Sequence, residues 1–68
     1  MINSEAIRNK MTEKGVTQKD AAEALGLAQS TLSQKINNHR PFYLDEAMSL
    51  ARLIGIELAD FGEYFFAS

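Results

Sequence analysis

Residues 29–36, QSTLSQKI, contain a run of uncharged hydrogen-bonding side chains. Leu32 and Ile36 are four residues apart, which is the spacing of apolar residues on one helix face. Amides and hydroxyls surround them: Gln29, Ser30, Thr31, Ser33 and Gln34. Neutral donors and acceptors suit a surface that is desolvated against a partner, because no charge is left unpaired there. A helix face that only contacts water is the alternative, although the rest of this chain uses Glu and Lys on such faces.

The length and composition of the chain limit the kinds of protein it can be. Its 68 residues are enough for one domain with a small core. The absence of Cys excludes disulfides and thiolate metal ligands, and it favours an intracellular location. The first ten residues, MINSEAIRNK, carry charges where a signal peptide needs an apolar run, and no stretch is apolar enough to span a membrane. We therefore expect a cytoplasmic protein.

Charge is distributed unevenly along the chain. The net charge of −2 argues against nucleic acid as a partner when taken alone. However, residues 41–68 carry one Arg and five acidic residues, whereas residues 1–40 have a small excess of positive charge. No acidic residue lies between Glu23 and Asp45, and this interval contains the polar run. One end of the molecule is therefore expected to tolerate phosphate groups while the other repels them.

The first half of the sequence predicts three short helices. Asn3 or Ser4 can cap the first of them, and Gly15 can end it with a positive φ. TQKD begins at Thr17 and has the pattern of a capping box, with Asp20 in the usual place of Glu or Gln. Apolar spacing and these signals place the helices at about 4–14, 18–25 and 29–37.

The second half predicts a loop and two further helices. Asn37 to Pro41 is a loop sequence, because Asn tolerates left-handed backbone and Pro disfavours a helical residue before it. The next helix ends at Gly55, and its apolar positions are Leu44, Ala47, Met48, Leu50, Ala51 and Ile54. The last helix is expected to use Leu58, Phe61 and Phe65. The expected fold is all-α, with five helices and no strand.

The second and third helices are separated by a very short turn that contains Gly26. Two short helices joined in this way cross steeply and form a helix-turn-helix. Ala22 is small where the two helices meet, and Leu32 can anchor the second helix to the core. Such a helix can project into a DNA major groove about 12 Å wide.

The segment QKDAAEALGLAQSTLSQKI resembles the helix-turn-helix of the phage repressor and Cro family, also called the XRE type. Gln18, Ala22, Gly26, Leu27 and Leu32 match the characteristic positions of that motif. The first helix and the segment LDEAMSLARLIGIEL are similar to the family's other helices, and LSQKINNHRPF is similar to small phage-encoded members. The resemblance therefore implies a five-helix, lambda-repressor-like DNA-binding domain over residues 1–68.

The resemblance also implies which residues contact DNA. The family reads bases from the start of the recognition helix, which makes Gln29, Ser30 and Gln34 the base-reading candidates, with Thr31 and Ser33 beside them. Gln can pair with adenine N6 and N7, and Ser can donate or accept at several bases. Gln18 corresponds to a helper that braces the first Gln and a phosphate. The backbone and phosphate candidates are Thr17, Gln18, Lys19, Lys35, Asn37, Asn38, His39 and Arg40, with Asn37 and Asn38 also offering backbone N–H groups.

Four positions depart from the family pattern. Ala28 stands where a Ser or Thr cap is usual, so the recognition helix lacks a cap typically worth about 1 kcal/mol. Met11 and Ile36 stand where many relatives have an Arg–Glu pair, and we expect an apolar contact between them instead. Lys35 occupies an often apolar site, and we expect its ammonium to extend toward phosphate.

Four aromatic residues lie among the last eight: Phe61, Tyr64, Phe65 and Phe66. Phe61 and Phe65 are four apart and are expected to close the core. A terminal helix cannot turn all four inward, so Tyr64 or Phe66 is expected to form an exposed partner surface. A twofold homodimer on DNA is the expected use of this surface, with an aromatic end lying on its own domain as the alternative.

We expect a non-enzyme without cofactor, metal or small-molecule ligand. There is one His, no Gly-rich phosphate loop and no base near Ser30 or Ser33. The sequence predicts a Cro- or repressor-like transcription regulator from a phage or prophage that binds a palindromic operator in double-stranded DNA. The alternatives are a protein-interaction module that docks another regulator through its acidic, aromatic C-terminus, and a DNA-binding component of recombination or an antitoxin.

Overall fold

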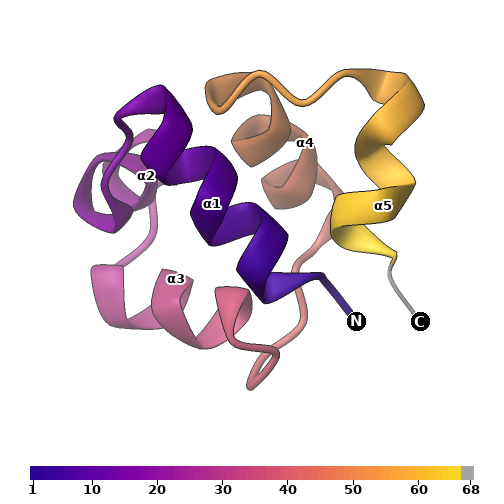
Figure 1. The fold of residues 1–68 in the computed structure, drawn as a ribbon. Helices are drawn as coiled ribbons and strands as arrows, with labels where there is room; N and C mark the ends of the chain where they lie inside the picture. The colour runs from indigo at the N-terminus through magenta and orange to yellow at the C-terminus, as the bar shows by residue number, and fades with distance from the viewer. Residues whose placement is uncertain (67–68) are drawn as a thin grey trace.

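The computed structural model describes residues 1–66 and contains only helices and loops in that range. The helices are α1 (Ser4–Lys14), α2 (Gln18–Leu25), α3 (Gln29–Ile36), α4 (Leu44–Leu53), the 3₁₀ turn η1 (Leu58–Asp60) and α5 (Phe61–Phe65). Figure 1 shows α1 running diagonally through the middle of the view, with α4 to its upper right, α3 at the lower end and α5 at the right. The expected all-α, five-helix fold is confirmed.

The helix ends follow from side chains that were recognisable in the sequence. The Asn3 side chain accepts a hydrogen bond from Ala6 N, 3.1 Å away, and thereby starts α1. Thr17 and Asp20 form the predicted capping box of α2, with bonds of 3.0 and 3.2 Å. Gly26 has a φ of 71° and ends α2 with the left-handed residue that the tight turn requires. Together these caps fix where α2 stops and where the chain turns toward α3.

The core lies where the helices meet. Its largest fully buried side chains are Ile7, Leu32, Ile36, Leu50 and Ile54. Ala21 and Ala22 are also buried and let α2 pack closely against its neighbours. Met11 belongs to the same core cluster as Ile36, as expected for an apolar replacement of an ion pair. Phe65 is buried and stacks on Phe61, with ring centroids 4.6 Å apart.

Three apolar residues expected on inward helix faces are instead exposed. Leu44 and Met48 have exposed fractions of 61% and 43%, and that of Leu58 is 86%. The inward face of α4 is formed by Ala47, Leu50 and Ala51 alone, because Leu44 lies in its first turn and Met48 at the edge of that face. Leu58 begins η1 and is exposed, whereas Ile56, two residues before it, is buried in the core.

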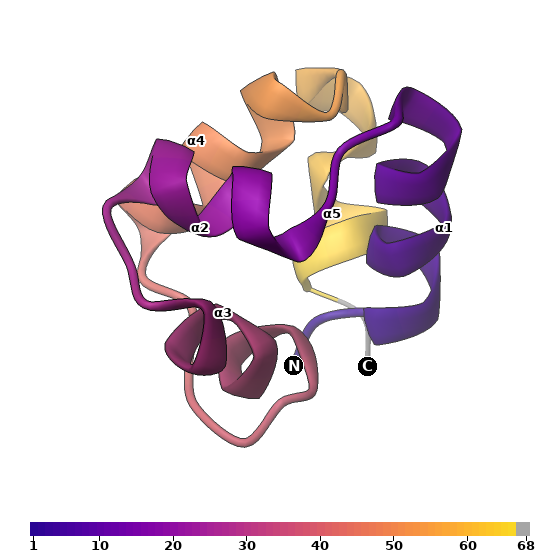
Figure 2. The same ribbon diagram turned by 90° about the vertical axis from the view of Figure 1, so that its left-hand side faces the viewer.

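The helix α3 lies at one end of the molecule (Figure 1) and packs against α2. In the view of Figure 2, it occupies the lower end, below α2 and α4. Its buried residues are Leu32, Lys35 and Ile36, so only one side of the helix faces the body. No helix within residues 1–66 is long and apolar enough to cross a membrane.

Candidate nucleic-acid interface

The outer side of α3 carries the polar side chains predicted to read bases. Gln29, Ser30 and Gln34 are exposed, and Thr31 and Ser33 are partly exposed. With about 3.6 residues per turn, Ser30 and Gln34 share the face opposite Leu32 and Ile36. Both side chains are therefore directed away from the body of the protein and are free to meet a partner.

The N-terminus of α3 lacks a side-chain cap, as Ala28 predicts. Ala28 has the extended backbone of an N-cap residue, with φ −67° and ψ 147°, but forms no capping hydrogen bond. The first N–H groups of the helix therefore have no side-chain partner at that end. A helix N-terminus carries a partial positive charge, which favours a nearby anion such as phosphate.

The start of α2 lies on the same helix-turn-helix unit and holds three of the phosphate candidates. Thr17 is exposed, but its hydroxyl is the acceptor of the capping box. Hydrogen bonding of the Asp20 carboxyl to the Thr17 side chain, and then to Thr17 N, lowers the pKa of that carboxyl from its ordinary value. Gln18 is half-buried and Lys19 is exposed. Of these three side chains, Lys19 alone carries a positive charge.

The loop after α3 is folded back on the helix. Its backbone N–H groups at Asn37, Asn38, His39 and Arg40 donate to carbonyls of residues 33–35, at 2.8–3.3 Å. The expectation that Asn37 and Asn38 offer free backbone N–H groups to phosphate is therefore wrong. His39 and Arg40 are exposed and present their side chains alone.

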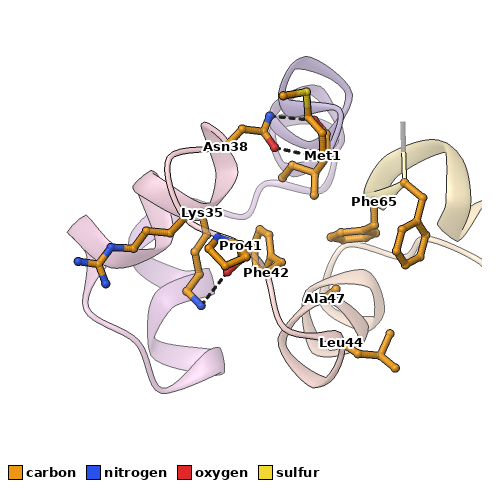
Figure 3. A pocket seen from close by; sticks show the side chains of 11 residues that line it. Met1, Lys35, Asn38, Pro41, Phe42, Leu44, Ala47 and Phe65 are labelled. Atoms are coloured by element: carbon orange, nitrogen blue, oxygen red, sulfur yellow. Dashed lines mark hydrogen bonds between the residues drawn. The ribbon is translucent and has the colours of Figure 1, made fainter. Parts of the chain in front are cut away.

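Asn38 holds the N-terminal segment to the end of α3. It has the predicted left-handed backbone, with φ 63°. Its side-chain oxygen accepts from Ile2 N at 2.9 Å, and its amide nitrogen donates to Ile2 O at 3.0 Å and to Ser4 Oγ at 3.1 Å. Figure 3 draws the two bonds to Ile2. The assignment of the Asn38 side chain to phosphate is thus corrected, because its amide is used within the fold.

Lys35 also differs from its prediction. Its ammonium lies 2.6 Å from Glu46 Oε1, 3.3 Å from Pro41 O and 4.6 Å from the centre of the Tyr43 ring. Only 6% of the residue is exposed, so the expectation that it extends toward phosphate is wrong. A buried ammonium requires a carboxylate partner, because its charge is otherwise left unpaired.

Glu46 is that partner and also caps α4. Its Oε1 accepts from Tyr43 N at 3.0 Å as well as from Lys35. Burial raises the pKa of the Glu46 carboxyl, but the hydrogen bonds from Lys35 and Tyr43 and the Lys35 charge outweigh it. The pKa is therefore lowered from its ordinary value. The carboxylate stays charged at neutral pH and holds α3, the loop and α4 together.

Two residues at this end of the molecule were not among the predicted site residues. The Arg8 guanidinium donates to Asn37 Oδ1 at 2.6 Å, which brings an exposed cation from α1 to the end of α3. The Ser4 hydroxyl donates to Ile36 O and satisfies a carbonyl at the C-terminus of α3. Both contacts join residues about thirty positions apart, so no local pattern indicated them.

Tyr64 and Phe66, the two aromatic residues predicted to form a partner surface, differ in their exposure. Tyr64 is partly buried against the core, and its carbonyl accepts from Asn3 N at 2.8 Å. Phe66 has an exposed fraction of 68% and borders a pocket of about 390 Å³ that also involves Phe42, Leu44 and Phe65. Figure 3 shows Phe65, Leu44 and Ala47 around this pocket. Of the two residues predicted to form a partner surface, Phe66 is the more exposed.

Comparison with known proteins agrees with this geometry. The family model described as helix-turn-helix matches residues 7–61, which include most of α1 and all of α2 to α4 and reach the start of α5. No curated protein sequence matches the chain. The family match covers more than half of the chain and contains the tight α2–α3 turn, the small Ala22 and the exposed polar face of α3. The chain therefore belongs to the XRE-type helix-turn-helix family of DNA-binding regulators.

Proposed function

We propose that the protein is a Cro- or repressor-like transcription regulator that binds a palindromic operator as a homodimer, with α3 in the major groove. The observation that carries the proposal is the uncharged outer face of α3. The side chains of Ser30 and Gln34 point away from the core, while Leu32 and Ile36 on the opposite face are fully buried. A helix anchored on one side and lined with amides and hydroxyls on the other suits base edges.

The proposed contacts divide into base reading and phosphate binding. Gln29, Ser30 and Gln34 read bases, with Thr31 and Ser33 at the sides of the helix. Lys19, His39 and Arg40 lie around α3 and are exposed, so they are the proposed phosphate contacts, with Thr17, Gln18 and the Asn37 side chain as neutral ones. Few cations take part, so the logarithm of affinity should fall gently with the logarithm of salt concentration, by about 0.9 per phosphate neutralised.

Dimer formation is proposed through the surface that contains Phe66. Met1, Leu44 and Phe66 are exposed and line the same pocket, and a contiguous exposed apolar patch favours association. A twofold dimer places two recognition helices about one turn of DNA apart, which is the reason for expecting a palindrome. Occupation of such a site blocks access of polymerase to an overlapping promoter, which is the proposed mode of repression.

The test is selection of bound duplexes from a random DNA library at low salt, followed by affinity measurements with Gln29→Ala. We expect an enriched palindrome, for which the variant loses roughly ten- to a hundredfold in affinity, as for one bidentate base contact. Its affinity for an unselected duplex should barely change. Asn9→Ala, which removes an exposed amide from α1, serves as the control and should bind like the wild type. Equal loss on both DNAs with Gln29→Ala would refute base reading.

A second candidate function is docking of another regulator without DNA reading. The exposed Phe66 and Leu44 beside the pocket favour it, together with the acidic residues Glu57, Asp60 and Glu63 on the same half of the chain. The same selection separates the two functions. A library that shows no enrichment at any protein concentration would favour the docking function.

A further inference from the structure

The structure contains a buried ion pair that no DNA contact explains. Lys35 is the charged residue that is buried among residues 1–66, and its side chain and that of Glu46 have exposed fractions of only 7% and 14%. Burying an ion pair seldom stabilises a fold more than apolar side chains of similar size would. The pair therefore requires an explanation other than stability.

The Lys35 ammonium is held from three directions. It donates to Glu46 Oε1 on α4 at 2.6 Å and to Pro41 O in the loop at 3.3 Å. The Tyr43 ring, 4.6 Å from the nitrogen, covers a further side. Figure 3 shows the bond from Lys35 to Pro41 on the loop that leads to α4. One side chain of α3 thus contacts both segments that follow it in the chain.

Lys35 supplies the side-chain hydrogen bond that attaches α3 to α4, whereas bonds of Ser4 and Asn38 attach the C-terminal end of α3 to the N-terminal segment. Leu32 and Ile36 bury apolar surface, and such burial has no preferred direction. The helix also lacks a side-chain cap at Ala28. Hydrogen bonds depend steeply on angle, so the bonds of Lys35 resist rotation on the side of α3 that faces α4, as those of Ser4 and Asn38 do at its C-terminal end. A small rotation would move Ser30 and Gln34, on the opposite face, away from the base edges.

We infer that the Lys35–Glu46 pair is a positioning device for the recognition helix, and that Glu46 keeps the Lys35 ammonium away from the DNA backbone. This inference rests on the proposed function. The pair holds α3 at one rotation and holds the 37–41 loop against it. It also withholds a cation from phosphate, so sequence-independent binding stays weak relative to binding of the operator.

The decisive variant is the double substitution Lys35→Met with Glu46→Gln. It removes one positive and one negative charge, so the net charge of −2 is preserved. Gln keeps an oxygen that can accept from Tyr43 N, and Met fills the space of the Lys stem without leaving a buried charge. The variant is therefore expected to fold, and changes in DNA binding cannot come from net charge.

Two measurements test the inference on this variant. Amide hydrogen exchange without DNA should become at least tenfold faster at residues 34–40, while the core amides of Leu50 and Ala51 keep their protection. The ratio of affinities for the selected duplex and an unselected duplex should fall at least tenfold. Unchanged exchange at residues 34–40 together with an unchanged ratio would overturn the inference.

The single variant Glu46→Gln tests the second part of the inference. Without its carboxylate partner, the Lys35 side chain should leave the interior and reach phosphate. Binding to an unselected duplex should then strengthen, and its salt dependence should steepen by about one phosphate. Glu63→Gln, an exposed residue of α5, is the control for the same change in net charge. A salt dependence that matches this control would overturn the sequestering role.

The exchange measurement needs no DNA, so it distinguishes failure of this inference from failure of the proposed function. If the wild type selects no duplex but exchange at residues 34–40 accelerates in the double variant, the proposed function fails, and the role of the Lys35–Glu46 pair in holding α3 is supported. If the wild type selects a palindrome and the double variant reads it equally well, the positioning role fails alone.

Discussion

Replacing Asn38 by Gly and by Ala separates two contributions of this residue to stability. Its side-chain amide forms three hydrogen bonds, two to the backbone of Ile2 and one to Ser4 Oγ. Its backbone has a φ of 63°, where most side chains are strained and Gly is not. Both variants lose the bonds, but only Asn38→Ala places a Cβ with no compensating hydrogen bond in the left-handed region.

The magnitudes follow from these contacts. A hydrogen bond of this kind contributes about 1 kcal/mol net, so loss of three costs roughly 2–3 kcal/mol. In Asn38→Gly, relief of the left-handed strain and the greater entropy of the unfolded chain nearly cancel. Asn38→Ala adds a conformational cost of about 1 kcal/mol. The expected order of stability is therefore wild type, then Gly, then Ala.

Urea unfolding followed by circular dichroism measures these differences. With a slope of about 1 kcal/mol per molar urea, the Gly variant should lower the midpoint by roughly 2 M. His39→Gly is the matched control, because His39 is exposed in the same loop and its side chain makes no hydrogen bond within residues 1–66. If Asn38→Gly were as stable as the wild type, the link between the N-terminal segment and α3 would contribute nothing. Equal stability of the Gly and Ala variants would show that the left-handed backbone carries no cost.

Further predictions concern the N-terminus of α3 and the carboxylates of Glu46 and Asp20. Ala28→Ser should raise the free energy of unfolding by about 1 kcal/mol by supplying the missing cap. Ala28→Asp should also raise the free energy of unfolding in urea titrations, but it should weaken binding to any duplex, because its negative charge faces phosphate. Undiminished binding would show that Ala28 does not lie near the DNA. The lowered pKa values of Glu46 and Asp20 mean that the folded state binds fewer protons, so stability is retained above pH 4.5, the ordinary Glu value, and declines as pH falls through the folded pKa. Thermal unfolding measured between about pH 3 and about pH 7 should show this decline in stability. An equally steep decline in Glu46→Gln would contradict the role of Glu46.

The sequence was sufficient to predict the helices because their ends depend on local contacts. Asn3, Thr17 and Asp20 act within three residues of the groups they cap, and Gly15 and Gly26 mark positions that require positive φ. The polar face of α3 was predictable for the same reason, since helical periodicity alone places Ser30 and Gln34 opposite Leu32.

The predictions that the structure contradicts concern contacts between residues distant in the sequence and residues at the edges of helix faces. Lys35 finds Glu46 eleven positions away across a loop, and Asn38 finds Ile2 thirty-six positions away. Periodicity identifies the centre of an inward helix face but not its width, so it predicts Met48 in the core, although Met48 lies at the edge of the inward face of α4 and is exposed. Contacts of this kind depend on how the helices are arranged, which sequence patterns do not specify.

The division of α3 into two sides has an evolutionary consequence. Leu32 and Ile36 hold the helix to the core, whereas Gln29, Ser30 and Gln34 are exposed. Mutations at the exposed positions change the surface without creating a cavity, so they carry little thermodynamic penalty. Such a protein can drift toward new target sequences one amino acid at a time while every intermediate remains folded. The same separation would let a library randomised at these three positions be screened for new specificities on an unaltered scaffold.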